Sequence, residues 1–173
     1  MYRAIRVFTL IAGSFGALLL AVYAYGIGQP LEHTARASIK IPAPPAVVWA
    51  AITDYSSMPS WWPEVKNITE ETRGDGVRIT WNEDSHGNKI GFITKQEAKE
   101  KLLVREILSD GQPFGGTWTY ELSAVDGGTL VTITEKGFIT PPVFRAIASL
   151  RGLDTTMKSY LGALEKHLGA RQQ

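Results

Sequence analysis

Glu135 is the acidic residue in this sequence whose position best suits proton transfer. It follows Val131 and Ile133 at every second position of an alternating segment, so the three side chains are expected on one buried face of a strand. A buried carboxyl group needs a partner or a raised pKa, because burial disfavours its charged form. Arg105, in a neighbouring strand segment, is a candidate partner. Alternatively, Glu135 lies at the rim of the sheet, where a partner or water stabilises its charge.

Aromatic residues at alternating strand positions predict an apolar wall. Trp81, Phe92, Trp118 and Tyr120 would share the buried face. They fit an ordinary sheet core, and they also fit the lining of a ligand cavity, where indole N–H and phenol O–H groups add polar contacts. Trp62 follows the first predicted helix, in a short helical turn, and could belong to the core or cover the cavity mouth. The predicted cavity residues are Trp62, Trp81, Phe92, Arg105, Phe114, Trp118, Tyr120 and Glu135.

Several kinds of chemistry are not predicted. The chain has no cysteine, which excludes disulfides, thiolate catalysis and cysteine metal sites. His33, His86 and His167 fall in three separate segments, so we expect surface histidines and neither a shared metal site nor a histidine-based catalytic group. Residues 82–87 resemble the start of a calcium loop, but Ile93 stands where the bidentate glutamate is required. No cofactor and no metal are therefore predicted.

The charge balance argues against a nucleic-acid surface. The formal net charge is +1, and without Arg3 and Arg6 the chain has 16 basic residues against 17 acidic ones. Nucleic-acid-binding domains concentrate positive charge instead. We therefore expect no nucleic-acid partner.

Seven strands and a long final helix are expected to position these side chains. The turn and alternation signals predict strands at about 32–41, 65–73, 77–82, 89–98, 101–109, 117–124 and 129–138, with a helix at 45–54 and a short helical turn near 58–62. Near the C-terminus, apolar residues recur at three- and four-residue steps, which predicts an amphipathic helix that Gly152 kinks or interrupts. The core face expected for this helix comprises Ile147, Leu150, Met157, Leu161, Leu164 and Leu168.

The N-terminus contains a membrane signal. Residues 7–28 carry no charge, and a helix of that length spans roughly 33 Å at ~1.5 Å per residue, enough for a bilayer. Arg3 and Arg6 precede it, which predicts a cytoplasmic N-terminus. We expect a signal anchor at 1–28, a linker at 29–31 and a domain at 32–173 outside the cytoplasm. The alternative is a signal peptide cleaved near Ala24, which would leave the domain secreted or periplasmic.

Three sequence blocks resemble the START-like (SRPBCC) superfamily, in its polyketide cyclase/dehydrase-like branch. The first block combines Ala43-Pro44, Val48-Trp49, Thr53-Asp54-Tyr55 and Trp61-Trp62-Pro63. The second is Gly127-Gly128-Thr129 and the strand pattern that follows it, and the third is the helix start Pro142-Val143-Phe144-Arg145. The resemblance covers about residues 32–170. It implies an α+β helix-grip fold, in which a curved antiparallel sheet of about seven strands encloses a long C-terminal helix. The uncharged run at residues 7–28 predicts one transmembrane helix before this fold.

The same resemblance implies a deep cavity and leaves three functions open. The first is a membrane-anchored domain that binds or carries a lipid-like or polycyclic small molecule. The second is a cyclase- or dehydratase-like enzyme with an acid or base in the cavity, for which Glu135 is the candidate catalytic residue. The third is a protein-interaction module of the co-chaperone kind.

Overall fold

The fold is a curved antiparallel sheet with helices on its concave side. In the computed structural model, the backbone is described for residues 2–109 and 111–170, and side chains for residue 14, residues 16–109 and residues 111–170. The elements, in chain order, are α1 (Tyr2–Ile27), β1 (Glu32–Ile41), α2 (Pro45–Thr53), a 3-10 helix η1 (Tyr55–Ser60), β2 (Asn67–Thr72), β3 (Arg78–Glu83), β4 (Lys89–Ala98), β5 (Leu102–Ile107), β6 (Phe114–Val125), β7 (Gly128–Ile139), α3 (Pro142–Arg151) and α4 (Thr155–Gly169).

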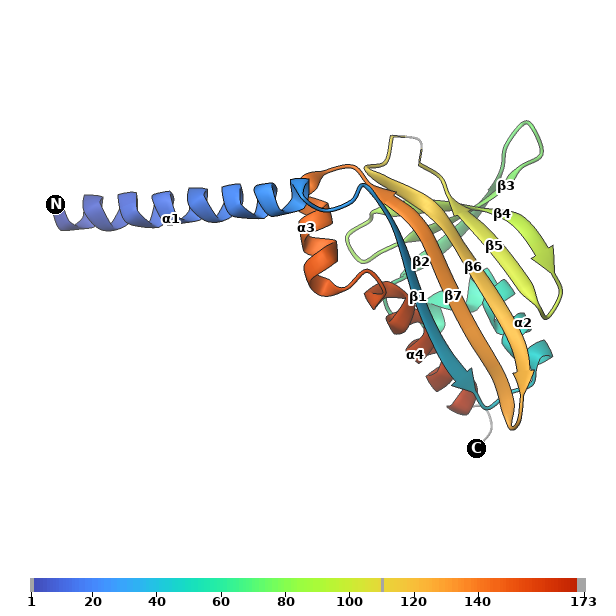
Figure 1. Cartoon of the computed structure of the whole chain (residues 1–173). Coiled ribbons are helices and arrows are strands. Elements are labelled where there is room, and N and C mark those ends of the chain that lie inside the picture. The colour runs from blue at the N-terminus through green and yellow to red at the C-terminus, as the bar shows by residue number, and fades with distance from the viewer. Residues whose placement is uncertain (1, 110, 171–173) are drawn as a thin grey trace.

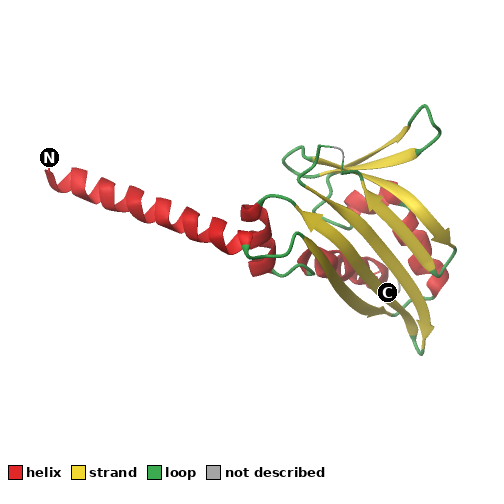
Figure 2. Ribbon diagram, turned by 45° about the horizontal axis from the view of Figure 1, so that its top comes forward, coloured by secondary structure: helices red, strands yellow, loops and turns green. Residues whose placement is uncertain are grey.

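The sheet has the order β1-β7-β6-β5-β4-β3-β2, and every neighbouring pair is antiparallel. Strands β2 to β7 follow one another through hairpins, and β1 then pairs with β7, so the first strand forms one edge of the sheet. Figures 1 and 2 show the strands curving around α4 and α2. The predicted α+β helix-grip architecture of seven strands is confirmed.

The C-terminal helix is interrupted at Gly152, as the sequence had allowed, and forms two helices. Helix α3 ends at Arg151, and Gly152 adopts a φ of +91°, a backbone conformation that residues other than glycine rarely adopt. The chain turns there and α4 begins at Thr155. The two helices therefore pack on different parts of the domain.

Only α4 supplies the expected core face. Its buried residues are Met157, Tyr160, Leu161, Leu164 and Leu168. The expectation was wrong for the two residues of α3, because Ile147 is 44% exposed and Leu150 is 71% exposed. The change of direction at Gly152 rotates these residues out of the phase that one continuous helix would have given them.

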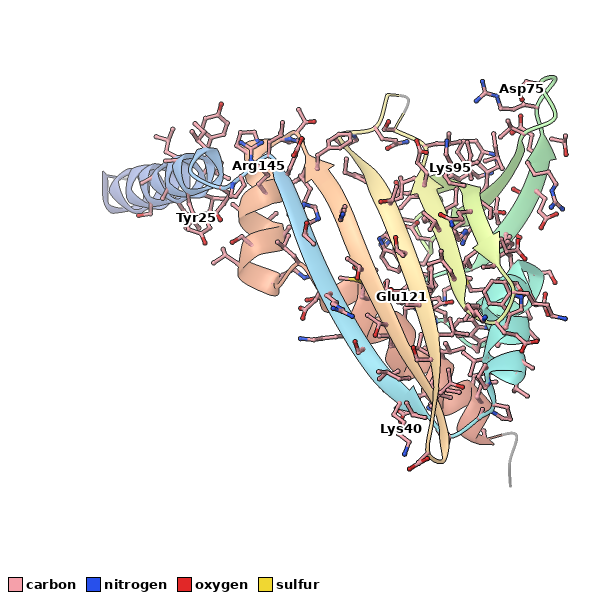
Figure 3. All side chains as sticks on the ribbon, turned by 45° about the vertical axis from the view of Figure 1, so that its right-hand side comes forward. Tyr25, Lys40, Asp75, Lys95, Glu121 and Arg145 are labelled. Atoms are coloured by element: carbon pink, nitrogen blue, oxygen red, sulfur yellow. The ribbon has the colours of Figure 1, made fainter. Side chains whose placement is uncertain are left out.

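The N-terminal helix meets the domain at α3. The Arg145 Nε atom donates a hydrogen bond of 3.0 Å to the Gly26 carbonyl oxygen, and the Tyr25 hydroxyl lies 3.2 Å from that of Ser149. Figure 3 labels Tyr25 and Arg145 at this junction, and Figure 1 shows α1 extending away from the sheet. A Cβ atom on Gly26 would lie 1.8 Å from the Pro142 carbonyl oxygen, so the close approach of the two helices requires glycine.

The expected membrane-spanning segment, residues 7–28, is described only in part. The side chains of residues 7–13 and 15 lie outside the described ones. In the part of the chain that the structure describes, no helix combines the length and the apolar character needed to cross a membrane. The expected transmembrane helix is therefore not supported by the structure.

Substitution of Leu161 tests the packing of α4 on the sheet. Leu161 is 2% exposed within the main core, so Leu161→Ala should lower the free energy of unfolding by roughly 2–5 kcal/mol. Leu150→Ala is the matched control and should change it by less than about 0.5 kcal/mol, because Leu150 is largely exposed. Urea unfolding of the full chain measures both values, and equal effects would contradict the observed packing.

Candidate ligand cavity

The concave face of the sheet does not close completely on α4. A cavity of about 650 Å³ remains between strands β3–β7, the η1 segment and α4, within the range typical of small-molecule sites. Aromatic and aliphatic side chains form much of its deep wall, whereas charged residues gather near the β3–β4 turn. The lining residues are Met58, Trp62, Glu64, Val65, Asn82, Glu83, Asp84, Ser85, His86, Asn88, Ile90, Phe92, Arg105, Ile107, Phe114, Trp118, Tyr120, Glu135, Arg151, Thr156 and Tyr160.

The structure brings seven of the eight predicted site residues to this one cavity. They come from the η1–β2 connection and from strands β4, β5, β6 and β7, which the antiparallel order places side by side. Their role in binding stays a prediction. The seven are Trp62, Phe92, Arg105, Phe114, Trp118, Tyr120 and Glu135.

Trp81 does not belong to the cavity. In the β3–β4 register, Thr80 pairs with Phe92 and Trp81 with Gly91, and successive residues of a strand point to opposite faces. The Trp81 side chain therefore lies on the outer face, where its Nε1 atom donates a 3.0 Å hydrogen bond to Glu71. The apolar alternation through Trp81 had marked the wrong face, because the cavity-side positions of β3 carry the polar residues Thr80 and Asn82.

Arg105 is the buried cation of the cavity. It is 2% exposed, and its guanidinium carbon lies over the ring of Tyr55 at 4.1 Å and over that of Phe92 at 4.5 Å. Such cation–π contacts offset part of the cost of burying the charge. Its Nε and Nη2 atoms have no hydrogen-bond partner. No ion pair of Arg105 occurs among the residues that the structure describes.

Arg105 is not the partner of Glu135, contrary to the expectation. Both residues pair with Trp118, Arg105 through β5–β6 and Glu135 through β6–β7. Two strand spacings of ~4.8 Å therefore separate their backbones by about 10 Å. The partner of Glu135 is instead His33, whose Nε2 atom lies 3.8 Å from the carboxylate Oε1 atom.

The His33–Glu135 pair is mostly buried. The side chains are 11% and 16% exposed, so the expectation of a surface histidine was wrong for His33. Gly137 lies opposite His33 in the register, and a Cβ atom there would approach the imidazole to 3.1 Å, so the absent side chain makes room for the ring. Glu135 also borders a second pocket of about 300 Å³ beneath α3.

Burial raises the pKa of the Glu135 carboxyl group above its usual value. The indole N–H of Trp118 and the His33 imidazole oppose this effect, although the Trp118 contact does not meet hydrogen-bond geometry. The carboxyl group is therefore suited to hold a proton at a higher pH than an exposed glutamate. Burial likewise raises the pKa of Tyr120, against the opposing positive charge of Arg105.

Tyr160 is a cavity residue that sequence reasoning missed. Its ring contacts four aromatic rings, with centroid distances between 5.1 and 6.3 Å, and its hydroxyl group has no hydrogen-bond partner. The available signal was its position three residues after Met157, on the apolar face of α4. The four rings belong to Trp61, Trp62, Trp118 and Tyr120.

Asn82 was missed because polar residues of a strand are normally assigned to the solvent face. It is 8% exposed, and its Nδ2 atom donates a long 3.9 Å contact to the Met58 sulfur. Its Oδ1 atom has no hydrogen-bond partner. Within the described part of the chain, no cluster of histidine and acidic side chains could hold a metal ion.

A family model confirms the assignment that the sequence blocks suggested. The family described as polyketide cyclase/dehydrase and lipid transport matches residues 32–169. The chain belongs to this family. Among curated proteins, no relative matches the sequence.

Solved structures show the same fold at low sequence identity. The di-domain aromatase/cyclase StfQ of the steffimycin biosynthetic pathway aligns with a TM-score of 0.67 at 11% identity, over 82% of this chain and 52% of that one. The Zhui aromatase/cyclase from Streptomyces sp. R1128 has the same TM-score and identity, over 82% and 96%. A START superfamily protein from Mycobacterium smegmatis aligns with a TM-score of 0.60 at 16% identity, over 80% and 98%. This chain thus spans about half the length of StfQ.

The buried Glu135 should make stability depend on pH in a defined direction. A carboxyl group whose pKa is raised by folding binds more protons in the folded state, so it costs stability as pH rises above the unfolded value of about 4.5. The free energy of unfolding of Glu135→Gln, relative to that of the natural protein, should therefore increase from pH 5 to pH 8. Urea unfolding at both pH values measures the difference. Glu121→Gln, on the outer face (Figure 3), is the control, and the same trend there would refute the assignment.

Proposed function

We propose that the domain binds or carries a hydrophobic small molecule, lipid-like or polycyclic, in the cavity between the sheet and α4. The observation that best supports this proposal is a cavity of about 650 Å³ with an aromatic wall, which is formed by Trp62, Phe92, Trp118 and Tyr160. Burial of about 300 Å² of apolar ligand surface would contribute roughly 7.5 kcal/mol before the costs of association. The family description, which includes lipid transport, supports the same reading.

An enzyme of the cyclase or dehydratase kind is the second candidate. It is favoured by the buried Glu135, whose raised pKa suits proton transfer, and by its contact with His33. The fold neighbours that are described as aromatase/cyclases support it as well. In this reading, Glu135 would give or take a proton at a substrate carbon or oxygen inside the cavity.

We also propose that the N-terminal helix tethers the domain to a membrane, with the domain outside the cytoplasm. This proposal rests on the uncharged run at residues 7–28 and on Arg3 and Arg6 before it. The exposed apolar side chains of Phe144, Ile147 and Leu150 on α3, beside the end of α1, are compatible with a nearby lipid surface.

Tryptophan fluorescence tests binding in the cavity. The full chain should change its emission when a long-chain fatty acid or a polycyclic aromatic compound is added. Trp118→Phe should reduce the response, because this indole lines the cavity, whereas Trp81→Phe should leave it intact, because that indole lies on the outer face. Native mass spectrometry and solvent extraction of the purified protein would identify a retained ligand. Absence of any ligand and of any fluorescence change would refute the proposal.

Glu135→Gln separates the carrier from the enzyme. A carrier should keep its affinity, since binding rests mainly on apolar contacts. An enzyme should keep binding but lose turnover by ~100-fold or more, the scale of lost acid–base catalysis. Binding titration and a turnover assay on the extracted ligand make the comparison, and unchanged turnover in the variant would exclude Glu135 as the catalytic group.

Topology can be measured directly. A reporter that is active only after export, fused behind Gln173, should be active in the full-length fusion and inactive when residues 1–28 are deleted. The uncharged segment is expected to direct export, whether it is retained as an anchor or cleaved. Membrane fractionation of the fusion distinguishes a retained anchor from a cleaved signal peptide. An inactive reporter in a full-length fusion that is present in the cytoplasm would contradict the proposed location.

A further inference from the structure

The guanidinium group of Arg105 has hydrogen-bond capacity that the described protein does not use. Burial of an arginine side chain at 2% exposure is costly unless its N–H groups meet acceptors, and an arginine cannot discard its charge. The Tyr55 and Phe92 rings offset part of that cost through their π faces, but a π face does not replace oxygen acceptors at the N–H edge. Arg105 is one of the residues that line the cavity, and its Nε and Nη2 atoms lack a hydrogen-bond partner. An acceptor group of a ligand in that space would supply the missing partners.

The surroundings of Arg105 are also rich in donors. Trp62, Trp118 and Tyr160 line the same cavity, and their indole N–H and hydroxyl groups lack hydrogen-bond partners. An indole N–H can only donate. Among these buried cavity groups in the described part of the chain, Asn82 Oδ1 can only accept a hydrogen bond, and the Tyr160 hydroxyl can donate or accept one. A complementary ligand group would therefore accept hydrogen bonds and carry negative charge.

None of the acidic residues that line the cavity forms an ion pair with Arg105 in the described part of the chain. Glu135 lies two strands away and contacts His33 instead. The acids near the β3–β4 turn have partners of their own. Glu83 lies 3.5 Å from the Lys89 ammonium group, and Asp84 accepts hydrogen bonds from the backbone and side chain of Asn88.

We propose that Arg105 anchors an anionic oxygen group of the ligand, such as a carboxylate, while the apolar body of the ligand lies against the aromatic wall. This inference rests on the proposed hydrophobic-ligand function and narrows it to apolar acids. Two parallel N–H···O bonds from a guanidinium to a carboxylate are among the strongest polar contacts in proteins. The ring contacts of Tyr55 and Phe92 restrict the orientation of the guanidinium group, which favours a fixed position for the acid group. Neutral molecules of the same shape would leave the Arg105 donors without a charged partner.

The experiment compares acids with their methyl esters on the full chain. Dodecanoate and methyl dodecanoate form one pair, and naphthalene-2-carboxylate and its methyl ester form another, titrated by tryptophan fluorescence. The natural protein should bind at least one acid about tenfold more tightly than its ester. In Arg105→Gln that preference should disappear, while the ester affinity stays within about threefold. Arg105→Lys should keep part of the preference, because it retains charge but not the planar fork.

Controls separate the possible failures. Arg36→Gln removes a cation on the outer face, 65% exposed, and should leave the preference unchanged. Ester binding by Arg105→Gln shows that the variant is folded, and if it does not fold, the natural protein and Arg105→Lys decide. Equal affinity for acid and ester in the natural protein, or a preference that survives in Arg105→Gln, overturns the anchor but leaves hydrophobic binding standing. Failure of the natural protein to bind any of the four probes overturns both the anchor and the proposed function for these ligand classes.

Discussion

The domain depends on the packing of α4 against the concave face of the sheet. Tyr160 lies at the centre of this contact, where its ring meets Trp61 and Trp62 from the η1 side and Trp118 and Tyr120 from β6. Aromatic pairs at these distances add to the effect of area burial. The same helix buries Leu161, Leu164 and Leu168, so its packing on the domain core continues over several turns.

The cavity follows from that arrangement. A sheet that curves and twists does not follow a straight helix along its whole length, so room remains between the sheet and α4. The strands then determine which groups face this room. In one row across the sheet, β5 contributes Arg105, β6 contributes Trp118 and β7 contributes Glu135. A cation and a carboxyl group thus face one cavity, yet an indole ring between them prevents their direct pairing.

This separation gives each charged group its own character. Arg105 keeps its charge and its unused donors, because a guanidinium group does not deprotonate in proteins. Glu135 can adjust by binding a proton, and burial raises its pKa accordingly. In a direct ion pair, each group would have satisfied the charge and the hydrogen bonds of the other. Their separation leaves one suited to hold an anionic ligand group and the other suited to exchange a proton, which keeps both the binding and the catalytic reading chemically reasonable.

Sequence alone determined the order of the elements and most of the cavity wall. The period-two alternation of β6 and β7 is strong because one face of each strand is buried, and it placed Trp118 and Glu135 on that face. The alternation failed on β3, where Ile79 is buried on the outer face beside Trp81 while Thr80 and Asn82 are buried on the cavity side. A strand buried on both faces has no single apolar phase to follow.

Only the tertiary structure decided which side chains meet. Glu135 contacts His33 because β1 closes the sheet beside β7, a pairing between segments about a hundred residues apart that local pattern does not encode. Tyr160 joins the aromatic wall only because α4 crosses that face, and the turn at Gly152 sends Ile147 and Leu150 to the surface although their spacing matched a core helix. Local periodicity records burial, whereas partners depend on strand order, register and helix direction, which are properties of the whole fold.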